Sequence, residues 1–145
     1  MSYKGIYKPS YPKKYKGDQR YIIYRSLWER KFMNYCDLNE NVLEWASEEF
    51  FIPYCDPTTN RVRRYFPDFF IKFKDRDGNI RRSVIEVKPM RETLEPKATK
   101  GKSRKTLINE SITYVKNQAK WKAAREFCAD RMWEFKVITE SELDI

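Results

Sequence analysis

Two acidic side chains and one lysine interrupt apolar stretches of this sequence. Glu86 and Lys88 stand in the run Ser83–Pro89, and Asp68 stands in an aromatic run over residues 65–71. A charged side chain in such a setting is costly unless it is paired or binds a metal ion. Carboxylates are the ligands that Mg²⁺ prefers, and a bound Mg²⁺ can activate water against a phosphodiester while a lysine offsets negative charge. These residue types therefore suit phosphodiester hydrolysis.

Each of these residues also has a plainer interpretation. Glu86 and Lys88 could form a surface ion pair on a half-solvated strand, and Asp68 could be a turn residue that follows Pro67. The apolar neighbours on both sides argue against these alternatives, because they predict that the segments are buried.

The chain of 145 residues contains no histidine. This excludes Ser-His-Asp and Cys-His catalysis, zinc bound through histidine, and any nuclease chemistry that uses an imidazole base. Its three cysteines form no C-x-x-C pair, so we expect neither a zinc ribbon nor a disulfide framework, and a reducing cytoplasm is the default compartment. No apolar run approaches the ~20 residues of a spanning helix, so no membrane partner is expected.

The net charge of +9 is unevenly distributed. Residues 1–31 carry nine basic and two acidic residues, and residues 91–105 carry six and two, whereas residues 32–60 carry six acidic residues and no basic one. The basic stretches suit the phosphate backbone of DNA, although a solvated, partly disordered tail explains the first one equally well. The expected DNA contacts are Lys13, Lys14, Lys16, Lys97, Lys100, Lys102, Arg104 and Lys105.

Periodicity and turn signals predict a basic N-terminal arm over 1–24 and a single α/β domain over 25–145. Ser26 and Glu29 have the spacing of a capping box, which predicts a helix over 26–37. Strands are expected over 42–54, 62–74 and 80–88, followed by a polar loop over 90–105. A helix over 106–129, a strand over 133–138 and a helical turn over 139–143 complete the chain. The apolar stripe of the longer helix would be Ile108, Ile112, Val115, Ala119, Ala123 and Phe127.

The turn at Asp75–Asn79 is expected to bring Asp68 and Glu86 together. Its Asp-Gly pair is typical of a tight hairpin, so the strands on either side should be antiparallel neighbours. Counting outward from the turn pairs Lys74 roughly with Ile80 and Asp68 roughly with Glu86. Side chains alternate along a strand, so Glu86 and Lys88 should share one face.

Pro67-Asp68 followed by Glu86-Val87-Lys88 resembles the PD-(D/E)XK signature of restriction-endonuclease-like nucleases. The order of the expected elements also agrees with the αβββαβ core of that family, a mixed four-stranded sheet flanked by helices. The family often carries a further glutamate on the helix before the sheet, and Glu29 matches that position. More narrowly, the whole chain, including the arm that begins Met1–Gly5, resembles a branch of the family found in T-even-type bacteriophages.

The resemblance implies roles for these residues. Asp68 and Glu86 would ligate Mg²⁺, with Mn²⁺ as a substitute, and the Val87 main-chain carbonyl would be a third ligand. Lys88 would orient the attacking water or stabilise the transition state. Glu29 would be an outer-shell or second-metal ligand, although a capping box alone also explains it. Gln118 resembles a helix glutamine that some members add to the site, but it can equally be an ordinary helix residue.

The resemblance also implies a function. It predicts a metal-dependent DNase with endonuclease and exonuclease action on double-stranded DNA, needed to finish DNA-filled phage heads before tails join. Portal or neck proteins would be its partners, the infected host cytoplasm or the virion its location, and no small-molecule cofactor would be needed. One alternative is a DNA-binding or structural neck protein that keeps the fold without turnover. Another is a junction-resolving or transposon-end nuclease of the same fold.

Overall fold

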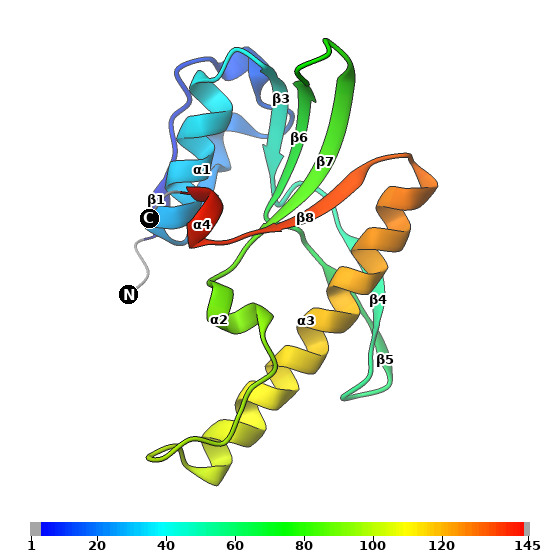
Figure 1. Cartoon of the computed structure of the whole chain (residues 1–145). Helices are drawn as coiled ribbons and strands as arrows, with labels where there is room; N and C mark the ends of the chain where they lie inside the picture. The colour runs from blue at the N-terminus through cyan, green and yellow to red at the C-terminus, as the bar shows by residue number, and fades with distance from the viewer. Residues whose placement is uncertain (1–3, 144–145) are drawn as a thin grey trace.

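The computed structural model describes residues 4–143. Residues 1–3 of the predicted arm and residues 144–145 of the predicted domain lie outside it. Its centre is a four-stranded sheet in the order β3 (Val42–Ser47), β6 (Phe69–Lys74), β7 (Ile80–Val87) and β8 (Glu134–Ile138). The first three strands are antiparallel neighbours, and β8 runs parallel to β7. Helix α1 (Leu27–Leu38) and helix α3 (Arg104–Asp130) lie on opposite sides of the sheet (Figure 1). The predicted mixed four-stranded α/β fold is confirmed.

Two apolar clusters hold these layers together. Phe32 and Met33 of α1 pack with Trp45, Phe69 and Ile85 of the sheet. On the other side, Trp121 and Ala124 of α3 pack with Ile52, Tyr54 and Tyr65, and with partly buried side chains of β8. Burial of apolar surface on both faces fixes the register, because a one-residue slip would turn each strand's apolar set to the wrong side.

The expected strands over 42–54 and 62–74 are each interrupted, so that part of the prediction is wrong. Residues 48–51 separate β3 from β4 (Ile52–Asp56), and residues 66–68 separate β5 (Arg61–Tyr65) from β6. Glu48 has a left-handed backbone conformation with φ 53°, which ends the extended run. Within residues 4–143, strands β4 and β5 pair only with each other, and they form a separate ribbon whose inner face packs on α3. With this ribbon as an insertion, the αβββαβ order is intact.

Most of the N-terminal arm is folded against the body of the molecule. It contains the two-residue strands β1 (Gly5–Ile6) and β2 (Ile23–Tyr24) and two short 3₁₀ turns, Pro12–Lys14 and Gln19–Tyr21. Tyr7 and Tyr15 are buried, and their rings lie edge-on to Trp45 at centroid distances of 5.9 and 4.7 Å. The alternative of a disordered tail is therefore wrong for residues 4–24.

Helix α3 begins at Arg104, after the four-residue helix α2 (Met90–Thr93) and an irregular segment. Its buried positions are Asn117, Trp121, Ala124 and Cys128, all in its second half. The first half projects beyond the sheet (Figure 1), which is why Ile108 and other members of the expected stripe are exposed. The predicted stripe is therefore wrong for this half. The chain closes with the short helix α4 (Glu140–Leu143). No helix within residues 4–143 has both the length and the apolarity to cross a bilayer.

Candidate active site

Asp68 and Glu86 are neighbours at the end of the β6–β7 pair. Lys74 pairs with Ile80, as the turn predicted, and Phe69 pairs with Ile85. Asp68 directly precedes β6 in a bend, so its turn character is real, but its side chain reaches β7: the Val87 amide donates to Asp68 Oδ2 at 2.8 Å. The two carboxyl groups are thus brought together from two strands.

Glu86 is only 5% exposed, although it carries a charge. The Tyr65 hydroxyl donates to Glu86 Oε1 at 2.9 Å, and Lys88 Nζ lies 3.8 Å from Glu86 Oε2. The expected common face of Glu86 and Lys88 agrees with this ion pair, which is too buried at Glu86 to be a surface pair. Each oxygen of this carboxylate therefore has a defined neighbour.

Asp68 lies in a less favourable environment. Burial is the largest cause that raises its pKa well above the usual range, and the charge of Glu86 is the next. The Val87 amide opposes the rise, and within residues 4–143 no hydrogen bond reaches Asp68 Oδ1. Two carboxyl groups placed together with so few donors form a site that attracts a cation.

Glu29 caps α1 and also lies near the two carboxylates of the candidate site. Its amide donates to Ser26 Oγ at 3.2 Å, and its Oε1 accepts from the Arg25 amide at 3.2 Å, so it caps α1. It also lies within electrostatic reach of the site, because burial first, and then Glu48 and Glu86, raise its pKa. Helix α1 thus directs a third carboxyl group toward the strand pair.

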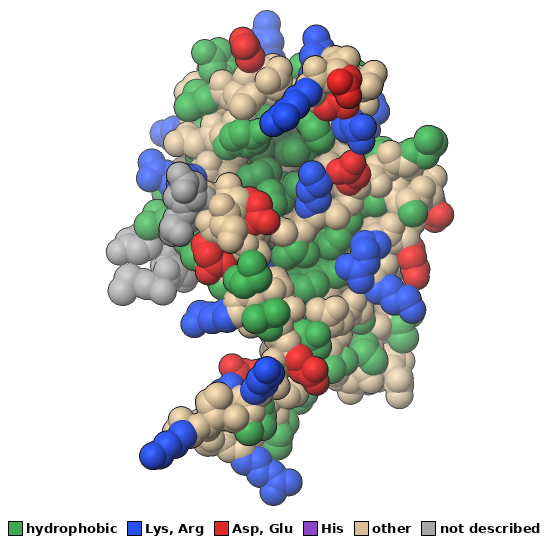
Figure 2. Space-filling view, in the orientation of Figure 1, with side chains coloured by type: hydrophobic (Ala, Val, Ile, Leu, Met, Phe, Trp, Pro, Cys, Tyr) green, Lys and Arg blue, Asp and Glu red, His purple; other side chains and the backbone are tan. Residues whose placement is uncertain are grey.

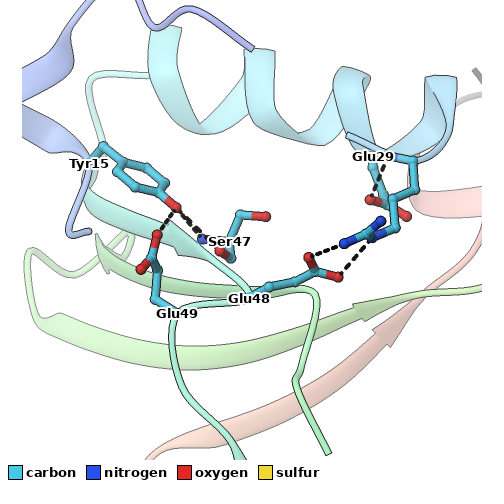
Figure 3. A network of polar contacts seen from close by, with 6 residues as sticks. Tyr15, Glu29, Ser47, Glu48 and Glu49 are labelled. Carbon is cyan, nitrogen blue, oxygen red and sulfur yellow. Dashed lines mark hydrogen bonds and ion pairs between the residues drawn. The ribbon is translucent and has the colours of Figure 1, made fainter. Parts of the chain in front are cut away.

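A further carboxyl group, that of Glu48, lies close to Glu29. Figure 3 shows Glu48 approaching Glu29 from the turn after β3. Arg25 joins the two: its amide donates to Glu29 Oε1, and its Nε and Nη2 donate to the Glu48 carboxylate at 3.2 and 3.1 Å. The Glu48 amide donates to the Asp68 carbonyl at 3.3 Å. In the same view, Tyr15 donates to Glu49 and contacts Ser47, which ties the N-terminal arm to this turn (Figure 3).

Sequence reasoning missed two side chains of the site. Tyr65 bonds Glu86, and Lys120 on α3 lies within electrostatic reach of Glu86 and Lys88. A tyrosine hydroxyl in a buried run needs a partner, which was an available signal for Tyr65. Gln118, the expected helix contribution, is half-buried and makes no hydrogen bond to Asp68, Glu86 or Lys88 within the described residues.

The expected DNA-binding residues fall into two groups. Lys14 Nζ donates to the carbonyls of Asp37 and Asn39 at 2.9 Å, so it caps the C-terminal end of α1, and Lys16 lies 3.7 Å from Glu44. Lys102 donates to the Lys97 carbonyl and pairs with Glu110 at 2.8 Å. No side-chain partner within residues 4–143 is seen for the exposed cations Lys13, Lys97, Lys100, Arg104 and Lys105. Figure 2 shows Lys and Arg side chains on the projecting end of the molecule.

The donor set fits one divalent cation with oxygen ligands. Asp68 and Glu86 supply carboxylates from the end of the β6–β7 pair, and burial first, then the charge of Glu86, raises the pKa of Asp68 although Lys88 opposes the rise. Within residues 4–143, no three acidic or cysteine side chains converge closely enough to hold an ion by themselves. A site here would therefore need a main-chain or water oxygen in addition to the two carboxylates.

Two comparisons with known proteins identify the family. A family model for the N-terminal domain of TnsA-like endonucleases matches residues 39–140. The head completion nuclease of Enterobacteria phage T4 is 36% identical over 146 aligned positions, which cover 99% of this chain and 95% of that protein. No solved structure shows a significant match. The predicted resemblance to restriction-endonuclease-like nucleases is confirmed, and this chain belongs to the TnsA-like endonuclease family.

Proposed function

We propose that this chain is a divalent-metal-dependent deoxyribonuclease that hydrolyses phosphodiester bonds of double-stranded DNA. The observation that carries the proposal is the convergence of Asp68, Glu86 and Lys88 at one end of the β6–β7 pair, in a chain of a nuclease family. A module that only binds DNA gains nothing from two carboxylates beside phosphates, since like charges repel. Mg²⁺ is the proposed ion, and Mn²⁺ should replace it.

The residues divide the work as follows. A bound Mg²⁺ would lower the pKa of the attacking water and polarise the phosphodiester. Asp68 and Glu86 would hold it, with the Val87 main-chain carbonyl as a further ligand. Lys88 orients the attacking water or offsets the negative charge that develops on the phosphate. Glu29 serves as an outer-shell or second-metal ligand.

The proposed biological role is the completion of DNA-filled phage heads before tails join. It is supported by similarity over almost the full chain to a protein named for that role. Endonuclease and exonuclease action, portal or neck partners, and a location in the infected host cytoplasm or the virion are parts of this proposal. Cleavage of linear, supercoiled and branched DNA in parallel would distinguish it from a junction-resolving or transposon-end activity.

Plasmid cleavage tests the proposed chemistry. We expect nicking in Mg²⁺ or Mn²⁺, none in EDTA, and none with Asp68→Ala. Asp77→Ala is the matched control, because it removes an exposed carboxylate from the turn between the same two strands. Equal cleavage by Asp68→Ala and wild type would reject the assigned site.

DNA binding can be tested at the projecting segment without cleavage. Replacing Lys97, Lys100, Arg104 and Lys105 together with Gln should weaken binding and reduce the slope of log K against log salt by about 0.9 for each lost phosphate contact. Lys102→Gln is the control, because this ammonium already pairs with Glu110. An unchanged slope in the fourfold variant would show that the segment does not touch DNA.

A further inference from the structure

Lys120 is placed unusually for a lysine on a helix. It precedes Trp121, which is 3% exposed, and its own side chain is half-buried where α3 packs on the β4–β5 ribbon. Its ammonium stands 5.8 Å from the Tyr65 ring centroid and 5.9 Å from the Tyr54 ring centroid. The two rings give the cation a fixed position, which a flexible lysine side chain otherwise lacks.

No carboxylate within residues 4–143 lies within ion-pair distance of this ammonium. One turn earlier on the same helix, Lys116 pairs with the buried Asp56 at 3.8 Å. A partly buried charge without a counter-ion is unfavourable, and burial accordingly lowers the pKa of Lys120. The nearby charges that act on it include Glu86 and Lys88, which belong to the active site. The protein thus holds an unneutralised cation beside its carboxylates.

Tyr65 connects this lysine with the metal-binding carboxylate. Its ring lies beneath Lys120, and its hydroxyl donates to Glu86 Oε1. Tyr65 therefore contacts the Lys120 ammonium through the face of its ring and the Glu86 carboxylate through its hydroxyl.

We propose that Lys120 is a second phosphate-binding lysine of the active site, and that Tyr65 is the positioning residue that holds Lys120 and Glu86 in register. This inference rests on the proposed nuclease function. Lys88 enters the site from β7 and Lys120 from α3, so a phosphodiester bound at the carboxylates meets positive charge from two elements. Lys120 binds a non-bridging oxygen of the substrate backbone, and the missing counter-ion is the DNA itself.

The test compares Lys120→Met with Lys116→Met. Methionine keeps most of the apolar stem and removes the charge. Lys120→Met should lower kcat/KM for plasmid cleavage about 10- to 100-fold, since an electrostatic contact to the reacting group is lost. Its Tm should stay equal or rise, because an unpaired buried charge is gone. Lys116→Met should cleave normally and lose stability, since it leaves Asp56 with one cation fewer. Lys120→Arg should recover at least part of the lost activity.

Binding of an uncleaved duplex in EDTA separates this inference from the proposed function. Lys120→Met should reduce the salt slope by about 0.9, the value of one phosphate contact. If Lys120→Met retains both wild-type cleavage and the wild-type slope while Asp68→Ala is inactive, the inference fails and the nuclease function stands. If the wild type does not cleave DNA in Mg²⁺ or Mn²⁺, the proposed function fails, and the salt slope alone decides for or against Lys120.

Tyr65→Phe tests the positioning role. The ring beneath Lys120 remains, and only the hydrogen bond to Glu86 is lost. We expect the rise in Tm on addition of Mg²⁺ to shrink and the Mg²⁺ concentration for half-maximal cleavage to increase, with an unchanged salt slope in EDTA. A wild-type Mg²⁺ response of the Tyr65→Phe protein would contradict the role of the hydroxyl.

Discussion

Two pairs of acidic side chains differ in how well their surroundings satisfy them. Asp37 and Asp56 are fully buried. Asp37 accepts hydrogen bonds from the Tyr7 hydroxyl and the amides of Ser10 and Tyr11. In contrast, Asp68 and Glu86 sit side by side, and at Asp68 a single amide is the only donor within the described residues. The number of hydrogen-bond donors therefore separates Asp68 from Asp37.

The pKa values of Asp56 and Asp68 are shifted in opposite directions. For Asp56, a hydrogen bond from the Thr58 hydroxyl is the largest cause that lowers the pKa, and Lys116 lowers it further. For Asp68, burial and then Glu86 raise it. The fold stabilises the charge at Asp56 and leaves it unfavourable at Asp68, where a metal ion and a substrate can relieve it.

The largest expected effect separates activity from stability. Asp68→Asn should reduce cleavage about 10³-fold, because a ligand of the metal ion loses its charge. Its Tm should stay equal or rise, since the repulsion with Glu86 is removed. Rate and thermal unfolding measured on the same sample check both expectations. A large loss of Tm would mean that Asp68 is structural, like Asp37.

Asp37→Asn should have the reverse profile. The amide cannot accept all three hydrogen bonds that the carboxylate accepts, so the free energy of unfolding should fall by about 2–3 kcal/mol. Cleavage by the folded fraction should change less than threefold, since Asp37 lies at the contact between the arm and the C-terminal end of α1. Urea denaturation measures the stability. A variant as stable as wild type would show that these hydrogen bonds contribute no net stability.

The smallest effect concerns pH. Because the pKa of Asp56 is lower in the folded protein than in the unfolded chain, its stabilising contribution is present above the unfolded value near 4. It is lost as pH falls through the folded value. Asp56→Asn should therefore remove part of the acid sensitivity, which Tm values between pH 2 and 7 would reveal. An identical pH dependence in the variant would show that Thr58 and Lys116 do not hold this pKa down.

The sequence predicted the Asp68–Glu86 contact because one local feature controls it. A short turn fixes the pairing of Lys74 with Ile80, and the strand period carries that register to the site. The breaks at 48–51 and 66–68 could not be predicted in the same way. Residues 48–51 are Glu-Glu-Phe-Phe and residues 66–68 are Phe-Pro-Asp, so each break contains aromatic residues that favour a strand. Pro67 was the one signal against a continuous strand in the second segment.

The contribution of α3 was missed for a related reason. Helical periodicity predicts which residues share a face, but it does not tell which half of a 27-residue helix lies against the body. Whether Gln118 or Lys120 faces the candidate site depends on the rotation of α3 about its axis and on the position of the β4–β5 ribbon. The sequence did not predict that ribbon. The folding of the N-terminal arm against the body could not be predicted either, because contacts such as Tyr15 with Trp45 join residues 30 positions apart.

The parallel pairing of β7 with β8 has a consequence for shortened forms of the chain. Glu86 pairs with Val137, and the Lys88 amide donates to the Ile138 carbonyl, so the strand that carries the candidate site gains its second neighbour from residues 134–138. A nascent chain that ends before residue 134 leaves β7 as an open edge. Completion of the sheet around Glu86 therefore requires residues 134–138.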